Sequence, residues 1–144
     1  MSNYKDVFDM VTDVRSLINI QSIKDLLGGG KIEPSVKSTG KTVKGIVVNG
    51  LSISNTADQI GYGNVNCYAP ALSSTVDGKV VLLPDQSTLS NLAKAVKNVI
   101  DSHFDGEFSC WIEEPGAPMQ DTDGSYFANC TYRYEFSQKN FKNI

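Results

Sequence analysis

The sequence predicts an α+β fold with the element order α-β-β-α-β-β, in which two helices pack on one face of a mainly antiparallel four-stranded sheet. Its 144 residues are 40% hydrophobic and 20% charged, a balance typical of one globular domain that can bury a core. Two segments place apolar residues at helical spacing, and four short segments suit strands. We therefore expect a single domain at residues 1–136 and a flexible C-terminal tail at residues 137–144.

The first predicted element is an amphipathic helix close to the N-terminus. Its apolar stripe comprises Tyr4, Val7, Phe8, Val11, Val14 and Ile18. The acidic residues between them, such as Asp9 and Asp13, turn toward solvent. A shorter turn of helix around Ile23 and Leu27 follows, and it ends at Gly28 because glycine reaches positive φ without strain.

The next part of the sequence indicates an extended connection followed by two paired strands. Residues 31–44 are polar and rich in lysine, which favours an extended connection with a short edge strand at Ile32. Segments 43–53 and 63–71 read as strands joined by a polar loop at residues 54–61. In the second strand Val65, Cys67 and Ala69 share one face. The residues from 76 to 80 predict a turn around Asp77 within a small protruding loop.

The second half of the chain predicts one helix and two strands. Pro84 precedes the helix and Asp85 is its expected N-cap. The apolar stripe of that helix comprises Leu89, Leu92, Ala93, Val96, Ile100 and His103. Segments 108–114 and 126–136 read as strands, and a long acidic loop at residues 115–124 separates them. Alternation over 126–136 puts Tyr126, Ala128, Cys130, Tyr132, Tyr134 and Phe136 on one face.

Charge and hydropathy exclude several classes of protein. The net charge of −3 argues against nucleic-acid binding through general phosphate neutralisation, which needs clustered lysine and arginine. No apolar run approaches the length of about 20 residues that spans a bilayer, so we expect no membrane partner. The N-terminus lacks the basic start and apolar stretch of a signal peptide. We expect a protein made in the cytoplasm.

Residues capable of chemistry are few, and their spacing does not favour an enzyme. Cys67, Cys110 and Cys130 lie in predicted strands, where buried thiols act as small hydrophobic groups. His103 lies on an apolar helix stripe, and no cysteine or histidine has metal-ligand spacing. Residues 38–42 end like a phosphate-binding loop, but Ser35 stands where that motif needs glycine. We expect no catalytic residues, metal or cofactor.

Two segments of opposite charge are candidates for a subunit interface or the wall of a channel, because complementary charge guides docking. The residues concerned are Lys31, Lys37, Lys41, Lys44, Glu113, Glu114, Asp121 and Asp123.

The middle of the chain resembles small proteins of the neck of tailed bacteriophages, namely tail terminators or tail-completion proteins. The resemblance lies in Gly45-Ile46-Val47-Val48-Asn49-Gly50-Leu51-Ser52-Ile53, in Gln59, in Gly63-Asn64-Val65-Asn66-Cys67-Tyr68-Ala69-Pro70, and in Pro84-Asp85 at a helix start. It covers roughly residues 1–136, and the α-β-β-α-β-β order agrees with that family's α+β fold.

This resemblance implies a structural protein of the virion that is assembled in the bacterial cytoplasm. It implies a ring, commonly of six subunits, that caps the tail tube and joins it to the connector or stopper protein. DNA would pass through the centre without specific binding. A ring needs head-to-tail contacts that close on rotation, and the charged segments could supply them. We hypothesise that the 115–124 loop faces a neighbour or the channel, and that the tail reaches an adjacent ring.

Three alternatives remain open on the sequence. The chain could form another ring of the neck, such as a stopper or adaptor. It could be a non-viral binding module that docks peptides at a sheet edge. It could also be a small enzyme that uses a thiol or carboxylates. The particle mass in solution, alone and with a tail-tube protein, separates the ring-forming proteins from the other two classes.

Overall fold

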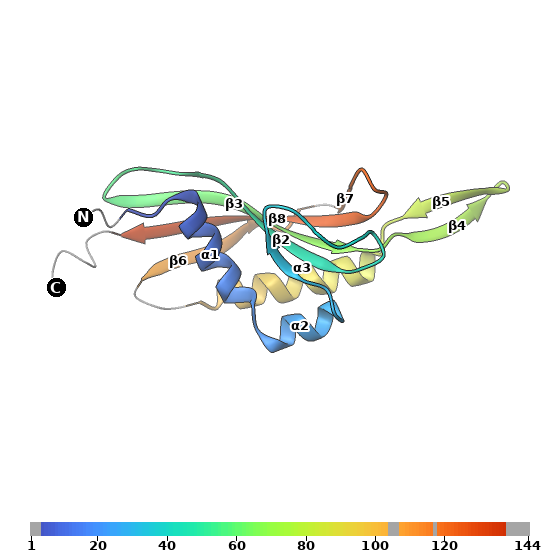
Figure 1. Ribbon diagram of the computed structural model, residues 1–144, viewed down its shortest axis with the longest axis horizontal. Coiled ribbons are helices and arrows are strands. Elements are labelled where there is room, and N and C mark those ends of the chain that lie inside the picture. The colour runs from blue at the N-terminus through green and yellow to red at the C-terminus, as the bar shows by residue number, and fades with distance from the viewer. Residues whose placement is uncertain (1–3, 104–106, 117, 138–144) are drawn as a thin grey trace.

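The computed structural model describes residues 4–103, 107–116 and 118–137, and within them three helices cover one face of a mostly antiparallel sheet (Figure 1). The helices are α1 (Val7–Ile18), α2 (Gln21–Leu27) and α3 (Gln86–Asp101). The predicted α+β class is confirmed. The weak helical turn predicted around Ile23 is the separate helix α2, so the prediction of two helices was one too few.

The main sheet has six strands in the described part of the chain, and the prediction of four was wrong. Its order is β1 (Ile32–Pro34), β2 (Gly45–Ile53), β3 (Asp58–Ala69), β8 (Tyr126–Ser137) and β6 (Phe108–Glu114), and β7 (Pro118–Gln120) also pairs with β8. Only β1 is parallel, and it pairs with β2. The predicted acidic loop folds back so that Pro118 pairs with Ala128. Such short edge strands carry too few residues to show an alternating pattern.

Strand β3 begins at Asp58, earlier than the predicted start at residue 63. Gly61 and Gly63 interrupt the side-chain alternation that would reveal these residues as a strand. At Gly61 a side chain would overlap with Met10 of α1, and at Gly63 with the hydroxyl of Tyr132. The glycines let a helix and a tyrosine approach the sheet, and this close packing hides the strand from its sequence pattern.

The helix ends follow local capping chemistry. Asp6 caps α1 by accepting a hydrogen bond from the Asp9 backbone N–H, and the Asp9 side chain accepts from the Asp6 backbone in return. Asp85 caps α3, as predicted, and accepts from the Thr88 N–H at 3.2 Å. The α2 helix stops at Gly28, which has a φ of 54°.

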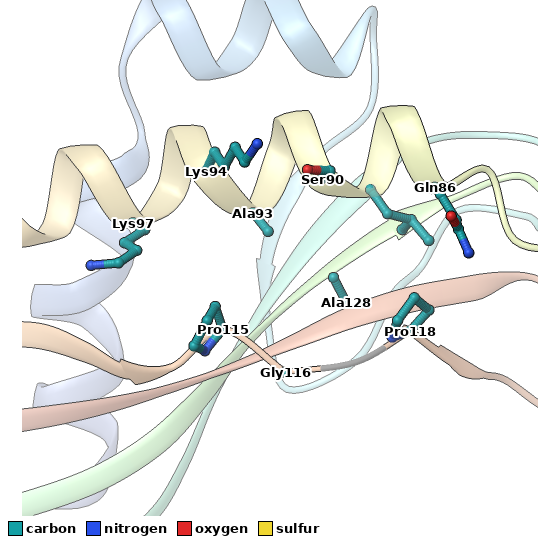
Figure 2. A pocket seen from close by; sticks show the side chains of 10 residues that line it. Gln86, Ser90, Ala93, Lys94, Lys97, Pro115, Gly116, Pro118 and Ala128 are labelled. Atoms are coloured by element: carbon teal, nitrogen blue, oxygen red, sulfur yellow. The ribbon is translucent and has the colours of Figure 1, made fainter.

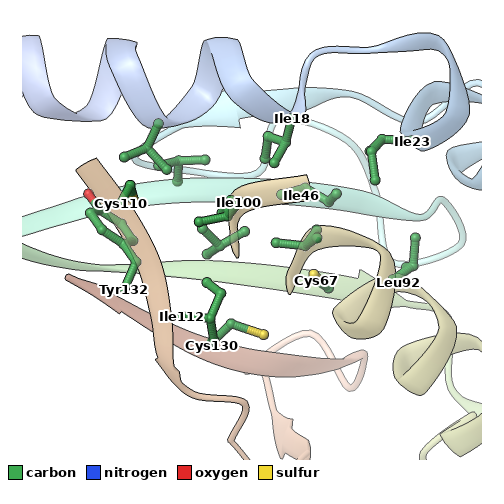
Figure 3. Packing of buried hydrophobic residues seen from close by; sticks show 14 of the residues in the cluster. Ile18, Ile23, Ile46, Cys67, Leu92, Ile100, Cys110, Ile112, Cys130 and Tyr132 are labelled. Carbon is green, nitrogen blue, oxygen red and sulfur yellow. The ribbon is translucent and has the colours of Figure 1, made fainter. Parts of the chain in front are cut away.

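The core lies between the helices and the sheet (Figure 3). The predicted inward residues of β8 are buried except Tyr126, which is half-buried at the edge of the core, and Val65, Cys67 and Ala69 of β3 are buried. The helices contribute apolar residues at helical spacing, which include Val14 and Ile18 of α1 and Leu92, Val96 and Ile100 of α3. Tyr4 and Phe8, which were predicted on the apolar stripe of the first helix, are exposed instead. The opposite face of the sheet carries no helix in the described residues and is polar and aromatic.

A second sheet consists of β4 (Leu72–Val76) and β5 (Lys79–Leu83), which form a hairpin that projects from one end of the molecule (Figure 1). The predicted turn is present, and its central residues Asp77 and Gly78 have φ angles of 51° and 78°. Positive φ at both positions is typical of the type I′ turn, whose twist matches that of a two-stranded hairpin.

The predicted C-terminal tail lies outside the described residues, except that Ser137 is the last residue of β8. None of the described helices combines the length and hydrophobicity that crossing a membrane requires.

Candidate assembly surfaces

The most exposed apolar feature is the projecting hairpin, which we call the arm (residues 72–83). Every strand residue of the arm is exposed, although its sequence is largely aliphatic. Its only charged residues are Asp77 and Lys79 at the tip. Soluble proteins usually protect edge strands with charge or cover them, and an isolated two-stranded hairpin is only marginally stable. The arm therefore has the properties of a surface that another protein covers.

The pairing register gives the two faces of the arm different chemistry. Leu72 pairs with Leu83 and Ser74 with Val81, and Val76 pairs with Lys79. Directly paired residues of antiparallel strands point to the same side, so Leu72, Val76, Val81 and Leu83 share one face with Ser74 and, next to the tip, Lys79. The other face alternates hydroxyl and aliphatic residues. We refer to the first as the apolar face of the arm.

The arm is attached to the body at its base. The Tyr126 hydroxyl donates a hydrogen bond to the Leu82 carbonyl at 3.2 Å, and the Leu82 side chain lies over Gly124. Beyond this root, the arm extends away from the helices and the main sheet (Figure 1). Anchoring at one end sets the direction of the arm and leaves the apolar face free.

A second apolar surface lies on the body beside α1, and we call it the α1 hollow. This cavity of about 460 Å³ is bounded by Val7, Phe8, Val11, Thr12, Arg15, Pro34, Ser35, Asn49 and Gly50. Phe8 is 77% exposed at its rim. An exposed aromatic side chain at the rim of a cavity is a feature found at binding surfaces.

A third surface is a groove of about 400 Å³ between α3 and the break that separates β6 from β7 (Figure 2). Ala93 of α3 faces Pro115, Gly116 and Pro118 across it, and Lys94 and Lys97 stand on its helix side. Lys97 is already paired with Asp101. We call this cavity the α3 groove.

Two lysines of the predicted interface, Lys37 and Lys41, lie within electrostatic reach of Asp123 of the same chain. The pKa of Asp123 lies below its usual range, chiefly because the Ser125 hydroxyl and backbone N–H donate to it, and Lys37 and Lys41 add attraction. Burial raises the pKa of Tyr68, and Asp121 and Asp123 raise it further.

The remaining predicted interface residues are spread over other parts of the fold. Lys31 joins Lys37 in lowering the pKa of Glu33, after the larger effect of the Ser38 hydrogen bonds. Glu113 and Glu114 are exposed on β6, and Glu113 contributes to the raised pKa of Arg133, whose main cause is Glu135. Lys44 is half-buried just before β2. The structure therefore brings Asp123 within electrostatic reach of Lys37 and Lys41, whereas Glu113 lies near Arg133 on another part of the sheet.

The potential nucleophiles lie inside the core. Cys67, Cys110 and Cys130 are free thiols and are buried (Figure 3). Burial raises the pKa of Cys110 to about 12, and the Cys130 hydrogen bond together with burial raises that of Cys67. The hydrogen bond with Cys67 lowers the pKa of Cys130, but the Cys130 side chain has no exposed surface. A reactive cysteine needs both a lowered pKa and access to solvent, because the exposed thiolate is the nucleophile. The His103 ring stacks on Phe108 with its centroid 4.6 Å away.

Neither metal nor phosphate binding gains support from the fold. In the described ranges, no cluster of three or more histidine, cysteine or acidic residues could hold a metal ion. The segment at residues 38–42 leads into strand β2. A phosphate-binding loop opens a helix, whose N-terminal N–H groups contact the phosphate.

Sequence reasoning identified the turn of the arm but missed its strands. An available signal was the pair of aliphatic runs flanking Asp77-Gly78, a pattern typical of a type I′ hairpin. The α1 hollow had no such signal, because it combines residues of α1, β1 and β2 that are far apart in sequence.

Comparisons with known proteins give no assignment. No protein-family model matches the sequence, and the search of curated proteins finds no relative.

Proposed function

We propose that this chain is a structural subunit of a tailed-phage neck, a tail terminator or tail-completion protein that works as a ring of six copies. The ring would cap the tail tube and join it to the connector or stopper, and DNA would pass through its centre. The phage assignment rests on the resemblance of residues 45–53, 63–70 and 84–85. The observation that supports assembly is the uncovered apolar face of the arm.

The surface chemistry supports an assembly role better than a catalytic one. A protein that acts alone in water rarely keeps a projecting aliphatic hairpin, since its free strand edges promote association with other chains. The thiols are buried, and the described residues hold no metal-binding cluster. These features suit a subunit that contributes shape and contact surfaces.

Measurement of particle mass tests this proposal. The purified chain is examined by mass photometry alone and with a tail-tube protein from the same genome. A ring of about six copies, formed alone or on the tube, is the expected result. Electron microscopy of particles produced without the chain should show heads and tails that fail to join. A chain that stays monomeric beside the tube, together with normal joining in its absence, would refute the proposal.

A peptide-binding module is the second candidate, and the α3 groove favours it. The groove opens beside the broken edge formed by β6 and β7, where main-chain groups of an extended peptide could pair. An apolar peptide with acidic residues would suit Lys94 at the rim. Ala93→Trp should fill the groove and abolish such binding. If the chain is instead a ring-forming neck protein, the same substitution should leave the particle mass unaltered.

A further inference from the structure

We propose that strand β4 of the arm pairs in antiparallel fashion with β4 of a second copy, so that two arms form one continuous sheet. This inference goes beyond the proposed neck function and does not depend on it. In the described residues β4 and β5 pair only with each other, so each strand has an outer edge outside the main sheet. Such an edge is a template on which another strand can add.

The turn of the arm fixes which main-chain groups lie on its outer edges. The residues that flank a two-residue hairpin turn form a hydrogen-bonded pair, which here is Val76 with Lys79. Along an antiparallel ladder, hydrogen-bonded pairs alternate with pairs whose N–H and C=O groups point outward. The outward groups therefore belong to Ser73 and Thr75 on β4 and to Val80 and Leu82 on β5.

The outer edge of β5 is held against the body, whereas that of β4 is open. The Tyr126 hydroxyl donates to the Leu82 carbonyl at 3.2 Å, which agrees with an outward direction of this carbonyl. Every residue of β4 is exposed. In the described part of the chain, no hydrogen bond engages the outward main-chain groups of Ser73 and Thr75. The β4 edge is therefore available for pairing.

The edges of the main sheet are protected, which identifies the partner strand. Pro34 of β1 lacks an N–H, and its carbonyl already accepts from the Val36 N–H at 2.8 Å. On β6 the Ile112 N–H donates to Asp101 of α3 at 2.9 Å. Strand β7 has three residues and begins at Pro118. Proline and charged side chains protect edges in this way. Among the described strands, β4 keeps an edge without such protection, so β4 of a second copy is the matching partner.

The β4 edge is complementary to itself in one register. When Ser74 lies on a two-fold axis, Ser73 faces Thr75 of the second copy, and their outward N–H and C=O groups meet. The same register places Leu72 beside Val76 of the second copy, which forms an apolar cross-strand pair. Strand β4 carries no charged residue, so no like charges meet across the axis. A sheet made from two arms is also more stable than an isolated hairpin.

This contact uses the same edge on both copies, so it is isologous and joins copies in twos. It cannot close a ring by itself, because ring closure needs a contact between two different surfaces. Arm pairing therefore doubles the mass of whatever particle the chain otherwise forms.

Two proline substitutions test the edge. Thr75→Pro removes an outward N–H from β4, and Val80→Pro removes one from β5 at the directly paired position. Both residues are exposed and neither N–H belongs to the β4–β5 ladder, so the arm should persist. Circular dichroism verifies that each variant is folded. Sedimentation velocity over rising protein concentration, without a tube protein, measures the mass.

The wild type and Val80→Pro should reach twice the mass of Thr75→Pro at the same concentration. Each copy of Thr75→Pro loses one hydrogen bond of the pairing, so its dissociation constant should rise about ten- to hundredfold.

Ser74→Cys tests the register. In the proposed pairing, residue 74 lies opposite itself in a non-hydrogen-bonded pair, where Cα atoms are about 4.5 Å apart and a disulfide can form. Ser73→Cys is the matched control, because its copy lies diagonally across the axis at about 7–8 Å. The native cysteines are buried. With oxidised glutathione, Ser74→Cys should therefore give a covalent dimer on a non-reducing gel, and Ser73→Cys should stay monomeric.

Several results would overturn the inference. They are a wild type with the same mass as Thr75→Pro at every concentration, equal dissociation of both proline variants, or equal cross-linking of both cysteine variants. The neck function is judged separately on the tail tube. Arm pairing in a chain that does not bind the tube would sustain the pairing and remove the neck function. Rings on the tube from a wild type that never pairs in solution would do the reverse.

Discussion

Tyr134→Phe tests the polar contact that attaches α1 to the sheet. Tyr134 is fully buried on β8, and its hydroxyl donates to Asp13 Oδ2 at 2.5 Å. The same oxygen accepts from Lys5 Nζ at 3.1 Å. Phenylalanine keeps the ring, which stacks on Phe108 with a centroid distance of 5.2 Å, and removes only the hydroxyl. The change therefore isolates one hydrogen bond to a carboxylate.

The structure sets the expected magnitude. A hydrogen bond to a charged group contributes about 1.5–3 kcal/mol. Because the Asp13 side chain remains 20% exposed, water and Lys5 partly replace the lost donor, and we expect a loss of about 2 kcal/mol. Tyr132→Phe is the matched control. Tyr132 is also fully buried, but it donates to the neutral carbonyl of Asn49 at 2.9 Å, so its loss should be about 1 kcal/mol.

Urea denaturation at pH 7, followed by circular dichroism, measures both losses. The dependence of the unfolding free energy on urea should be unchanged, because neither variant alters the surface exposed on unfolding. A double-mutant cycle with Asp13→Asn should give a coupling of about 1 kcal/mol or more between Asp13 and Tyr134. A loss at Tyr134 no larger than that at Tyr132, or a coupling near zero, would refute the reasoning.

Three further predictions concern the core. Gly63→Ala should lower the free energy of unfolding, measured by urea denaturation, by about 2 kcal/mol or more, because the added Cβ would overlap with the Asn49 carbonyl oxygen. The control Gly40→Ala should leave this free energy unchanged, because there is open space at Gly40. Equal effects of the two substitutions would contradict the packing at Gly63. Leu92→Ala should cost about 2–5 kcal/mol by leaving a cavity under α3, and a loss below 1 kcal/mol would place Leu92 outside the core. Burial raises the pKa of Cys110 from about 9 to about 12, so the unfolded thiol loses its proton at a lower pH than the folded one. The free energy of unfolding should therefore be unaffected by this group below pH 9 and fall by about 1.4 kcal/mol per pH unit as the pH rises to 12. The Cys110→Ala variant should show a shallower decline of this free energy with pH, and parallel curves for the variant and the wild type would exclude the contribution.

Prediction from sequence succeeded for those elements whose residue pattern lies within one short segment. The alternation at residues 126–136 identified the buried face of β8, and Asp85 identified the start of α3. Both signals are local, since a strand alternates every second residue and a cap contacts a backbone N–H three residues away. The edge strand predicted at Ile32 is β1, whereas the three residues of β7 were predicted as part of a loop, because so short a strand shows no alternating pattern.

The sequence alone determined the α+β class, the principal elements and most of the residues that face the core, because periodicity reports how each segment divides between apolar and polar sides. It was wrong for Tyr4 and Phe8, which it placed on the apolar stripe of the first helix and which are exposed. Tertiary structure decided which surfaces remain available for contact. It placed Lys37 and Lys41 beside Asp123 of the same chain and left the aliphatic arm uncovered. Exposure and charge compensation depend on residues far apart in sequence, so only the folded arrangement reveals them.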